Sequence, residues 1–351
     1  MNWRFWRRTS ETAAVDGGQS GLVRLVERAA LAVVVSYLVV CGVLAWWWDT
    51  EPAPFDIGQN AATHAHANGQ EVVRGYTTVA TLQRIAATLL DKRGGFLSND
   101  QFPPGVWMDN MPAWEFGVLV QVRDLARAMR NDFSRSQSQS TEDPDLSEAE
   151  GKFFYDSRSW LFPPSESEYR DGIRYLDGYL KRIADQNNPH AQFYARADNL
   201  RNWLSGVETR LGSLSQRLSS AVGKQQTNID LAGDAAARQS TTGPAAFTPL
   251  KTPWLEIDDV FYEARGYTWS LILLLRAIEI DFGEVLDKKN ARPSLEQIIH
   301  ELEPTQQPLW SPMILNGDGF GFLANHSLVM ASYIARANAA IIDLRALLQQ
   351  G

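Results

Sequence analysis

One uncharged stretch near the N-terminus, residues 29–48, limits what this chain can fold into. Its 20 residues contain no Asp, Glu, Lys or Arg. As an α-helix it would be about 30 Å long, which matches the hydrocarbon core of a bilayer. A cleaved signal peptide is disfavoured, because the run is long and Trp46, Trp47 and Trp48 stand where small cleavage-site residues belong. We therefore predict one uncleaved transmembrane helix rather than a buried core helix.

The charges on either side of this run predict its orientation. The upstream side carries five arginines, namely Arg4, Arg7, Arg8, Arg24 and Arg28. Downstream, Asp49 and Glu51 come first, and no Lys or Arg follows until Arg74. Because positively charged flanks stay in the cytoplasm, we predict that residues 1–28 are cytoplasmic and that the rest of the chain crosses the membrane. The three tryptophans are expected at the far membrane interface, so the lipid bilayer is the first predicted partner.

Composition excludes some functions for the exported part. The formal net charge of the chain is −8, and no basic stripe follows the membrane segment, which argues against a nucleic-acid partner. Cys41 is the only cysteine and lies in the membrane segment, so the exported part has no disulfide and no thiol chemistry. His64 and His66 are too few ligands for a metal site, and we interpret residues 49–70 as a solvated tether. No cofactor is predicted.

The exported part has the apolar spacing of helices and no convincing strand pattern, which predicts an all-α bundle. Residues 71–222 contain several helices and a long aromatic loop at 96–112, which we expect to pack against the rest of the domain. Two apolar seams with heptad spacing, 169–183 and 193–221, flank an Asn-Asn-Pro break. We predict that they form a long antiparallel helical hairpin. A coiled coil or self-association with a second chain through the 193–221 seam is the alternative.

The C-terminal part follows a polar linker at residues 223–248 and is expected to pack on the same bundle. Residues 254–288 are predicted as one helix that is apolar on all sides, which is typical of a helix in the middle of a bundle. Arg265 and Glu279 interrupt it, so we do not interpret it as a second membrane span. A final helix is predicted at residues 325–348.

Four charged residues on this central helix form the main candidate site: Asp258, Asp259, Glu263 and Arg265. Buried charges are costly unless they are paired, so these residues either form ion pairs with other helices or line a wet pocket. We favour the ion-pair interpretation. Asp318, in a glycine-rich loop, and His326 are weaker ligand-binding candidates. The loop is not a dinucleotide fingerprint, because no strand precedes it, and no catalytic or metal-binding set is predicted.

Three long stretches carry a resemblance that spans nearly the whole chain. They are RGGFLSNDQFPPGVWMDNMPAWEFG (93–117), WLEIDDVFYEARGYTWSLILLLRAIEIDF (254–282) and SPMILNGDGFGFLANHSLVMASYIARANAAIIDLR (311–345). Together with the N-terminal anchor, the chain resembles a family of uncharacterised proteobacterial single-pass inner-membrane proteins. The resemblance implies a bacterial inner membrane and a periplasmic C-terminal domain. It assigns no activity and no site residues.

Two functions follow from these observations. We favour a non-enzymatic envelope protein, in which the anchored helical domain binds a protein or another envelope component. The alternative is a periplasmic enzyme or small-ligand binder that uses the charged residues of the 254–288 helix. A ligand site of that kind requires these residues to converge on one cavity that is open to solvent.

Overall fold

The computed structural model describes residues 19–136, 141–185, 191–222, 224–227, 247–311, 313–317 and 322–350. The chain divides into two compact units, Met1–Trp47 and Trp48–Gly351. The described part of the first unit is helix α1 (Gln19–Trp48), whose last residue opens the second unit. By length and overall composition, residues 23–48 of this helix are long and apolar enough to cross a bilayer. This confirms the predicted N-terminal apolar helix, although α1 begins earlier than residue 29.

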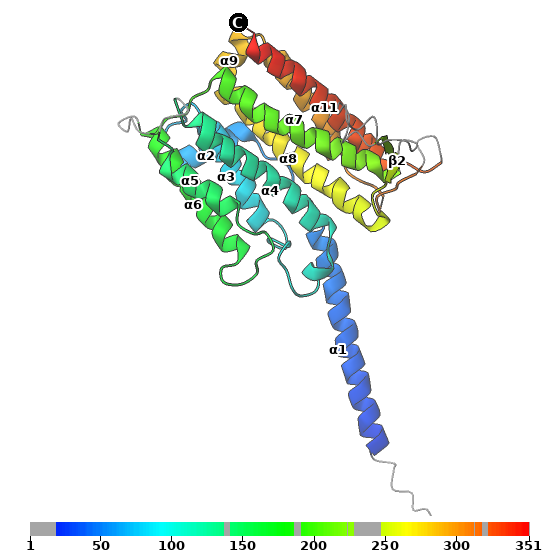
Figure 1. Ribbon diagram of the computed structural model, residues 1–351. Coiled ribbons are helices and arrows are strands. Elements are labelled where there is room, and N and C mark those ends of the chain that lie inside the picture. The colour runs from blue at the N-terminus through cyan, green and yellow to red at the C-terminus, as the bar shows by residue number, and fades with distance from the viewer. Residues whose placement is uncertain are drawn as a thin grey trace, which may run out of the picture. The chain divides into compact units, whose positions relative to one another are not determined.

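The second unit is built from helices, which confirms the predicted all-α class (Figure 1). Its α-helices are α2 (Ile57–Ala67), α3 (Tyr76–Asp91), α4 (Asn110–Ala128), α5 (Pro144–Phe153), α6 (Ser165–Ala184), α7 (Ala197–Ser219), α8 (Ile257–Asp281), α9 (Gly283–Lys288), α10 (Arg292–Leu302) and α11 (His326–Gln349). Short 3-10 turns lie at Gly105–Trp107, Ser220–Val222, Trp254–Glu256 and Glu303–Gln306, and α4 continues into a π turn at Met129–Phe133. Within the predicted 223–248 linker and just beyond it, β1 (Lys224–Thr227) and β2 (Phe247–Leu250) form one antiparallel pair.

Helix α8 lies in the middle of this unit, as its all-round apolar sequence predicts. It contacts α3, α4, α7, α10 and α11, and most of its side chains are buried. Its closest neighbour is α4, where Gly117 of α4 and Gly266 of α8 face each other's backbones. A methyl group at Gly266 would overlap the carbonyl oxygen of Trp114, and one at Gly117 would overlap the carbonyl oxygen of Glu263. Glycine at both positions therefore lets the two helix backbones touch.

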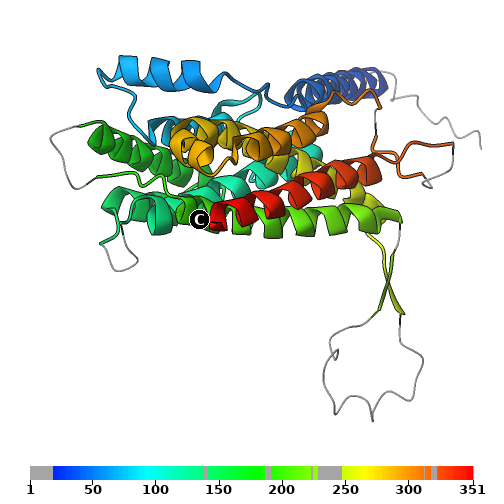
Figure 2. The ribbon, with the colours of Figure 1, turned by 90° about the horizontal axis from the view of Figure 1, so that it is seen from above.

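The two heptad seams do not pair with each other as predicted. Helix α6 packs chiefly on α5 and α3, whereas α7 packs chiefly on α11, alongside which it lies in both views (Figures 1 and 2). The extended residues 191–196 separate the two helices: Phe193 packs between Phe133 and Phe282, and the Tyr194 N–H donates to the carbonyl oxygen of Phe133. The α7 seam, from Leu200 to Leu218, is buried within this one chain, and that burial leaves it no open face for a second copy.

Two connecting segments differ from their predictions: part of the expected tether is helical, and part of the aromatic loop is exposed. Residues 57–67 of the expected tether form α2, capped by Asp56, because Ile57, Ala61 and Ala65 face the bundle. In the 96–112 loop, Phe96 and Leu97 are buried as expected. The tip of the loop is exposed instead, and its exposed apolar side chains are Phe102, Val106 and Trp107.

Helix α11 also has the length and composition of a membrane span. Its apolar face, however, is buried against α7 and α10. Its two arginines pair with neighbouring helices: Arg336 lies 2.8 Å from Glu301 of α10, and Arg345 pairs with Glu208 of α7. We therefore describe α11 as a bundle helix.

The crossing of α4 and α8 gives a stability prediction. In the full chain in detergent micelles, Gly266→Ala should lower the free energy of unfolding by about 1–3 kcal/mol, because the new methyl group has no space against the α4 backbone. The matched control is Gly206→Ala on the exposed side of α7, where nothing lies within 4 Å. That change should raise the free energy of unfolding by about 0.5–1 kcal/mol. Equal effects of the two changes in denaturant titrations would show that the crossing is not tight.

Candidate functional site

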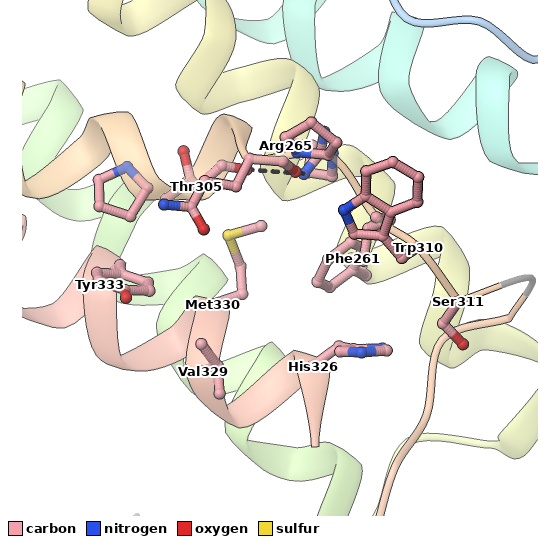
Figure 3. Close-up of a pocket in the computed structure, with 13 residues that line it drawn as sticks. Phe261, Arg265, Thr305, Trp310, Ser311, His326, Val329, Met330 and Tyr333 are labelled. Atoms are coloured by element: carbon pink, nitrogen blue, oxygen red, sulfur yellow. Dashed lines mark hydrogen bonds between the residues drawn. The ribbon is translucent and has the colours of Figure 1, made fainter. Parts of the chain in front are cut away.

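A cavity of about 530 Å³ lies between α8, α11 and residues 304–311 (Figure 3). Most of its wall is apolar, and the apolar lining side chains are Phe261, Pro304, Pro308, Leu309, Trp310, Val329 and Met330. Its polar lining residues are Arg265, Thr305, Gln307, Ser311, His326 and Tyr333. This volume is in the range of ordinary small-molecule sites, which are also mostly apolar with a few polar groups.

Arg265 stands in the cavity wall, but its guanidinium group is already occupied. Its Nε and Nη2 atoms donate to the two carboxylate oxygens of Glu51 at 2.6 and 2.5 Å. Its Nη1 donates to the carbonyl oxygens of Thr305 and Gln307 at 2.9 and 3.0 Å (Figure 3). The arginine therefore joins the segment that follows the anchor to α8 and to the cavity wall. It leaves little donor capacity for an anionic ligand.

His326 contributes a neutral imidazole to the same cavity. It is the first residue of α11, and Asn325 caps this helix by accepting the Leu328 N–H. The Nδ1 of His326 accepts the backbone N–H of Leu315 at 3.0 Å, which assigns the ring proton to Nε2. Burial lowers the pKa of His326 from its ordinary value, in keeping with the neutral form. The cavity thus offers apolar walls with uncharged donors, a combination suited to a neutral apolar group.

The predicted acidic residues lie elsewhere. Asp259 and Glu263 line a second cavity of about 330 Å³ together with Asp109. Both carboxylate oxygens of Glu263 accept hydrogen bonds from Arg217 of α7, each at 2.6 Å. Asp258 lines neither of these two cavities, and its Oδ1 accepts the backbone N–H of Asp259. Glu263 and Arg265 are thus both paired with other segments, as the ion-pair interpretation expects.

The six predicted ligand residues are therefore divided among separate places. Arg265 and His326 share the 530 Å³ cavity, Asp259 and Glu263 share the smaller one, and Asp318 lies outside the described residues. Within the described ranges, no group of three or more His, Cys, Asp or Glu is placed to hold a metal ion.

Sequence reasoning missed Phe261, Trp310 and Met330, which line the larger cavity. It also missed Glu51, which does not line this cavity but binds its arginine, Arg265. Glu51 gave no signal, because a single carboxylate in an apparent tether has no marked partner in the sequence. A tryptophan in a proline-rich loop was the one available hint for Trp310.

A family model described as "Uncharacterized protein conserved in bacteria (DUF2333)" matches residues 23–351 of the chain. No curated protein and no solved structure matches the chain.

Breaking the largely buried pair between Arg265 and Glu51 should destabilise the fold. Arg265→Met should lower the free energy of unfolding of the full chain by about 3–5 kcal/mol, because it leaves the Glu51 carboxylate and two carbonyl oxygens without their donor. The control on the same helix is Arg276→Met, whose partner Glu303 is exposed, and it should cost less than about 1 kcal/mol. Equal losses in thermal melts would contradict a structural role for the Glu51 pair.

Asp259 should make stability depend on pH. Burial, and then the charges of Asp109, Asp258 and other nearby carboxylates, raises its pKa from 3.8 to about 6. The folded state therefore binds more protons than the unfolded state between these values, and stability should increase as the pH falls through 6 towards 4. Asp259→Asn should raise the melting temperature at pH 8 and change nothing below about pH 4.

Asp287→Asn is the control of opposite sign. Arg292 donates to Asp287 and holds the pKa of this carboxyl below its ordinary value, so its stabilising contribution is present at pH 8 and is lost in acid. That variant should melt lower than wild type at pH 8. A lower melting temperature of Asp259→Asn at pH 8 would mean that attraction to the N-terminus of α8 outweighs the carboxylate repulsion.

Proposed function

Because the chain belongs to the DUF2333 family of uncharacterised bacterial proteins, we propose its function from its own geometry. It is a single-pass protein of the bacterial inner membrane, with its N-terminus in the cytoplasm and its helical domain in the periplasm. This domain binds an envelope component and does not catalyse a reaction. The arginines before the anchor and the acidic residues after it support this topology.

The observation that carries the binding role is the 530 Å³ cavity. Its wall is mainly aromatic and aliphatic, its arginine is saturated by Glu51 and two carbonyl groups, and its histidine is neutral. These features favour an uncharged apolar group over an anion. In a membrane-anchored protein, the acyl chain of a lipid or of a lipid-carrying envelope molecule has this chemistry.

The cavity also supports binding over catalysis. A serine and a histidine that line the cavity are each engaged with the backbone and not with each other: Ser311 Oγ donates to the carbonyl oxygen of Met313, and His326 Nδ1 accepts the N–H of Leu315. The carboxylates at 259 and 263, which the enzyme alternative requires, line the other cavity. A nucleophile and a base within hydrogen-bonding reach are the usual mark of a covalent mechanism.

A protein partner is the second candidate. Trp310 is 95% exposed at the cavity, and aromatic side chains of this kind are frequent in protein interfaces. In this case an apolar side chain of the partner would occupy the cavity. Because the α7 seam is covered by α11, such a partner would bind at the cavity rather than at residues 193–221.

The test is photo-crosslinking of the full chain in nanodiscs that contain a phospholipid with a photoreactive group on its acyl chain. We expect two labelled regions: the anchor, as an internal control, and the peptides that line the cavity on α8 and α11. Val329→Trp, at a half-exposed position in the cavity wall, should reduce labelling of the cavity several-fold and leave the anchor unchanged.

The matched control is Ile342→Trp, at a similarly exposed position of α11 away from the cavity, and it should change neither region. Labelling of the anchor alone would rule out an acyl-chain ligand. Recovery of a crosslinked protein at the cavity from native membranes would then favour the protein partner.

A further inference from the structure

One end of the helical unit carries its exposed aromatic side chains. Helices α4, α6, α8 and α11 all begin at this end, which lies towards the lower right of Figure 1. We call it the aromatic end and define it by the described residues of the segments that lead into these helices, namely 93–109, 154–164, 254–256, 307–311, 313–317 and 322–325. Among the described residues of the second unit, every exposed Trp or Phe lies in these segments or in the first two turns of α4.

Several of these side chains have almost no protein contact. Phe162 is 92% exposed, Trp310 is 95% exposed and Phe322 is fully exposed. Phe102 and Trp254 are exposed by 71% and 74%. Large apolar side chains in such numbers mark an interaction surface when they are grouped together, whereas isolated ones are normal.

Contacts between the segments show that they are grouped. The rings of Phe102 and Trp160 lie 6.3 Å apart in an edge-to-face arrangement, which joins the first two segments. The 330 Å³ cavity is lined by Asp109, Arg158 and Asp259, so the start of α8 adjoins both. The last segment lies against α8 around the larger cavity.

The aromatic end is held in place by a buried ion pair. Glu115 of α4 is fully buried and lies 2.6 Å from the Lys92 ammonium group. Its carboxylate also accepts the backbone N–H groups of Leu97 and Ser98, both at 2.8 Å. These bonds fix the path of the chain from α3 into the exposed tip at Phe102, so the tip is presented by a rigid base.

The chain enters the second unit at the same end. Trp48 is the last residue of the anchor helix and packs against the core, and a Cβ on Gly94 would lie only 2.7 Å from its Cγ. Three residues later, Glu51 is bonded to Arg265 of α8. The tryptophan that is expected at the membrane interface is therefore built into the aromatic end.

We propose that the aromatic end of the helical unit rests on the bilayer surface and places its Phe and Trp side chains in the headgroup region. The proposal rests on the membrane anchoring proposed above. The anchor keeps this end at the membrane, so binding of the aromatic side chains is in effect intramolecular and needs only modest affinity. Trp and Phe are the side chains that favour the interface, where an apolar ring can enter while polar atoms stay hydrated.

The acidic residues near the aromatic end indicate whether it would bind lipid through charge or through its aromatic rings. Asp109 and Asp259 line the same 330 Å³ cavity, and the charge of Asp109 contributes to the raised pKa of both Asp259 and Asp49. An acidic surface is not attracted to anionic lipid headgroups. Contact must therefore come from partition of the aromatic rings, and it should persist at high salt.

The test uses the full chain in nanodiscs and exploits its single cysteine. In a Cys41→Ser background, Phe162→Cys and Ile342→Cys each receive an environment-sensitive fluorophore; Ile342 is the control, because it is exposed on the C-terminal half of α11. We expect a spin-labelled phosphatidylcholine to quench the probe at 162 several-fold more than the probe at 342, at both low and high salt. Equal quenching at the two positions would overturn the proposal.

A second variant separates docking from mere closeness to the membrane. The same fluorophore is attached at Trp254→Cys, and its quenching by the spin-labelled lipid is measured in two proteins. One retains the native aromatic side chains, and the other carries serine at four positions: Phe102, Phe162, Trp310 and Phe322. Its quenching should fall in the serine variant, and unchanged quenching would contradict docking by these rings. If the probe is shielded from water in native membranes but is not quenched by the spin-labelled lipid, the proposal is overturned, and the result would favour a protein partner at this surface. Failure of the chain to enter nanodiscs would instead count against the proposed anchor.

Discussion

The backbone contact between α4 and α8 is the constraint on which the rest of the helical unit depends. Gly117 and Gly266 remove the side chains that would separate the two helices, and α8 can then lie in the middle of the bundle. This close crossing turns Glu263 towards Arg217 of α7 and Arg265 towards the segment after the anchor. Although Glu263 and Arg265 are only two residues apart, they form ion pairs with different parts of the chain.

The bond between Arg265 and Glu51 connects three features that are distant in the sequence. Glu51 belongs to the segment that follows α1, Arg265 belongs to the central helix, and Thr305 and Gln307 belong to the cavity wall. A buried ion pair is weak evidence for net stability, but it is specific in its geometry. Here it places the apolar cavity beside the point at which the chain enters the second unit.

The cavity and the aromatic end fit one physical picture. A domain that rests on a bilayer through exposed Trp and Phe rings brings its apolar cavity close to a source of acyl chains. Trp310 belongs to both features, since it lines the cavity and is 95% exposed. The cavity carries no net charge, because Glu51 neutralises Arg265 and His326 is neutral, so a chain could enter it without separating an ion from its partner.

The sequence by itself determined the apolar N-terminal helix, the all-α class, the buried central helix and the inward face of α7. These are local properties, because a run of apolar residues or a period of 3.6 residues depends on nothing outside its own segment. Periodicity defines a face but not the partner of that face, so the α7 seam was assigned to α6 although it packs on α11. Likewise, only the tertiary structure decided that Arg265 and His326 share a cavity, that Asp259 and Glu263 belong to another, and that Glu51 neutralises Arg265. Each of these outcomes depends on which segments meet across long sequence distances, and no local pattern contains that information.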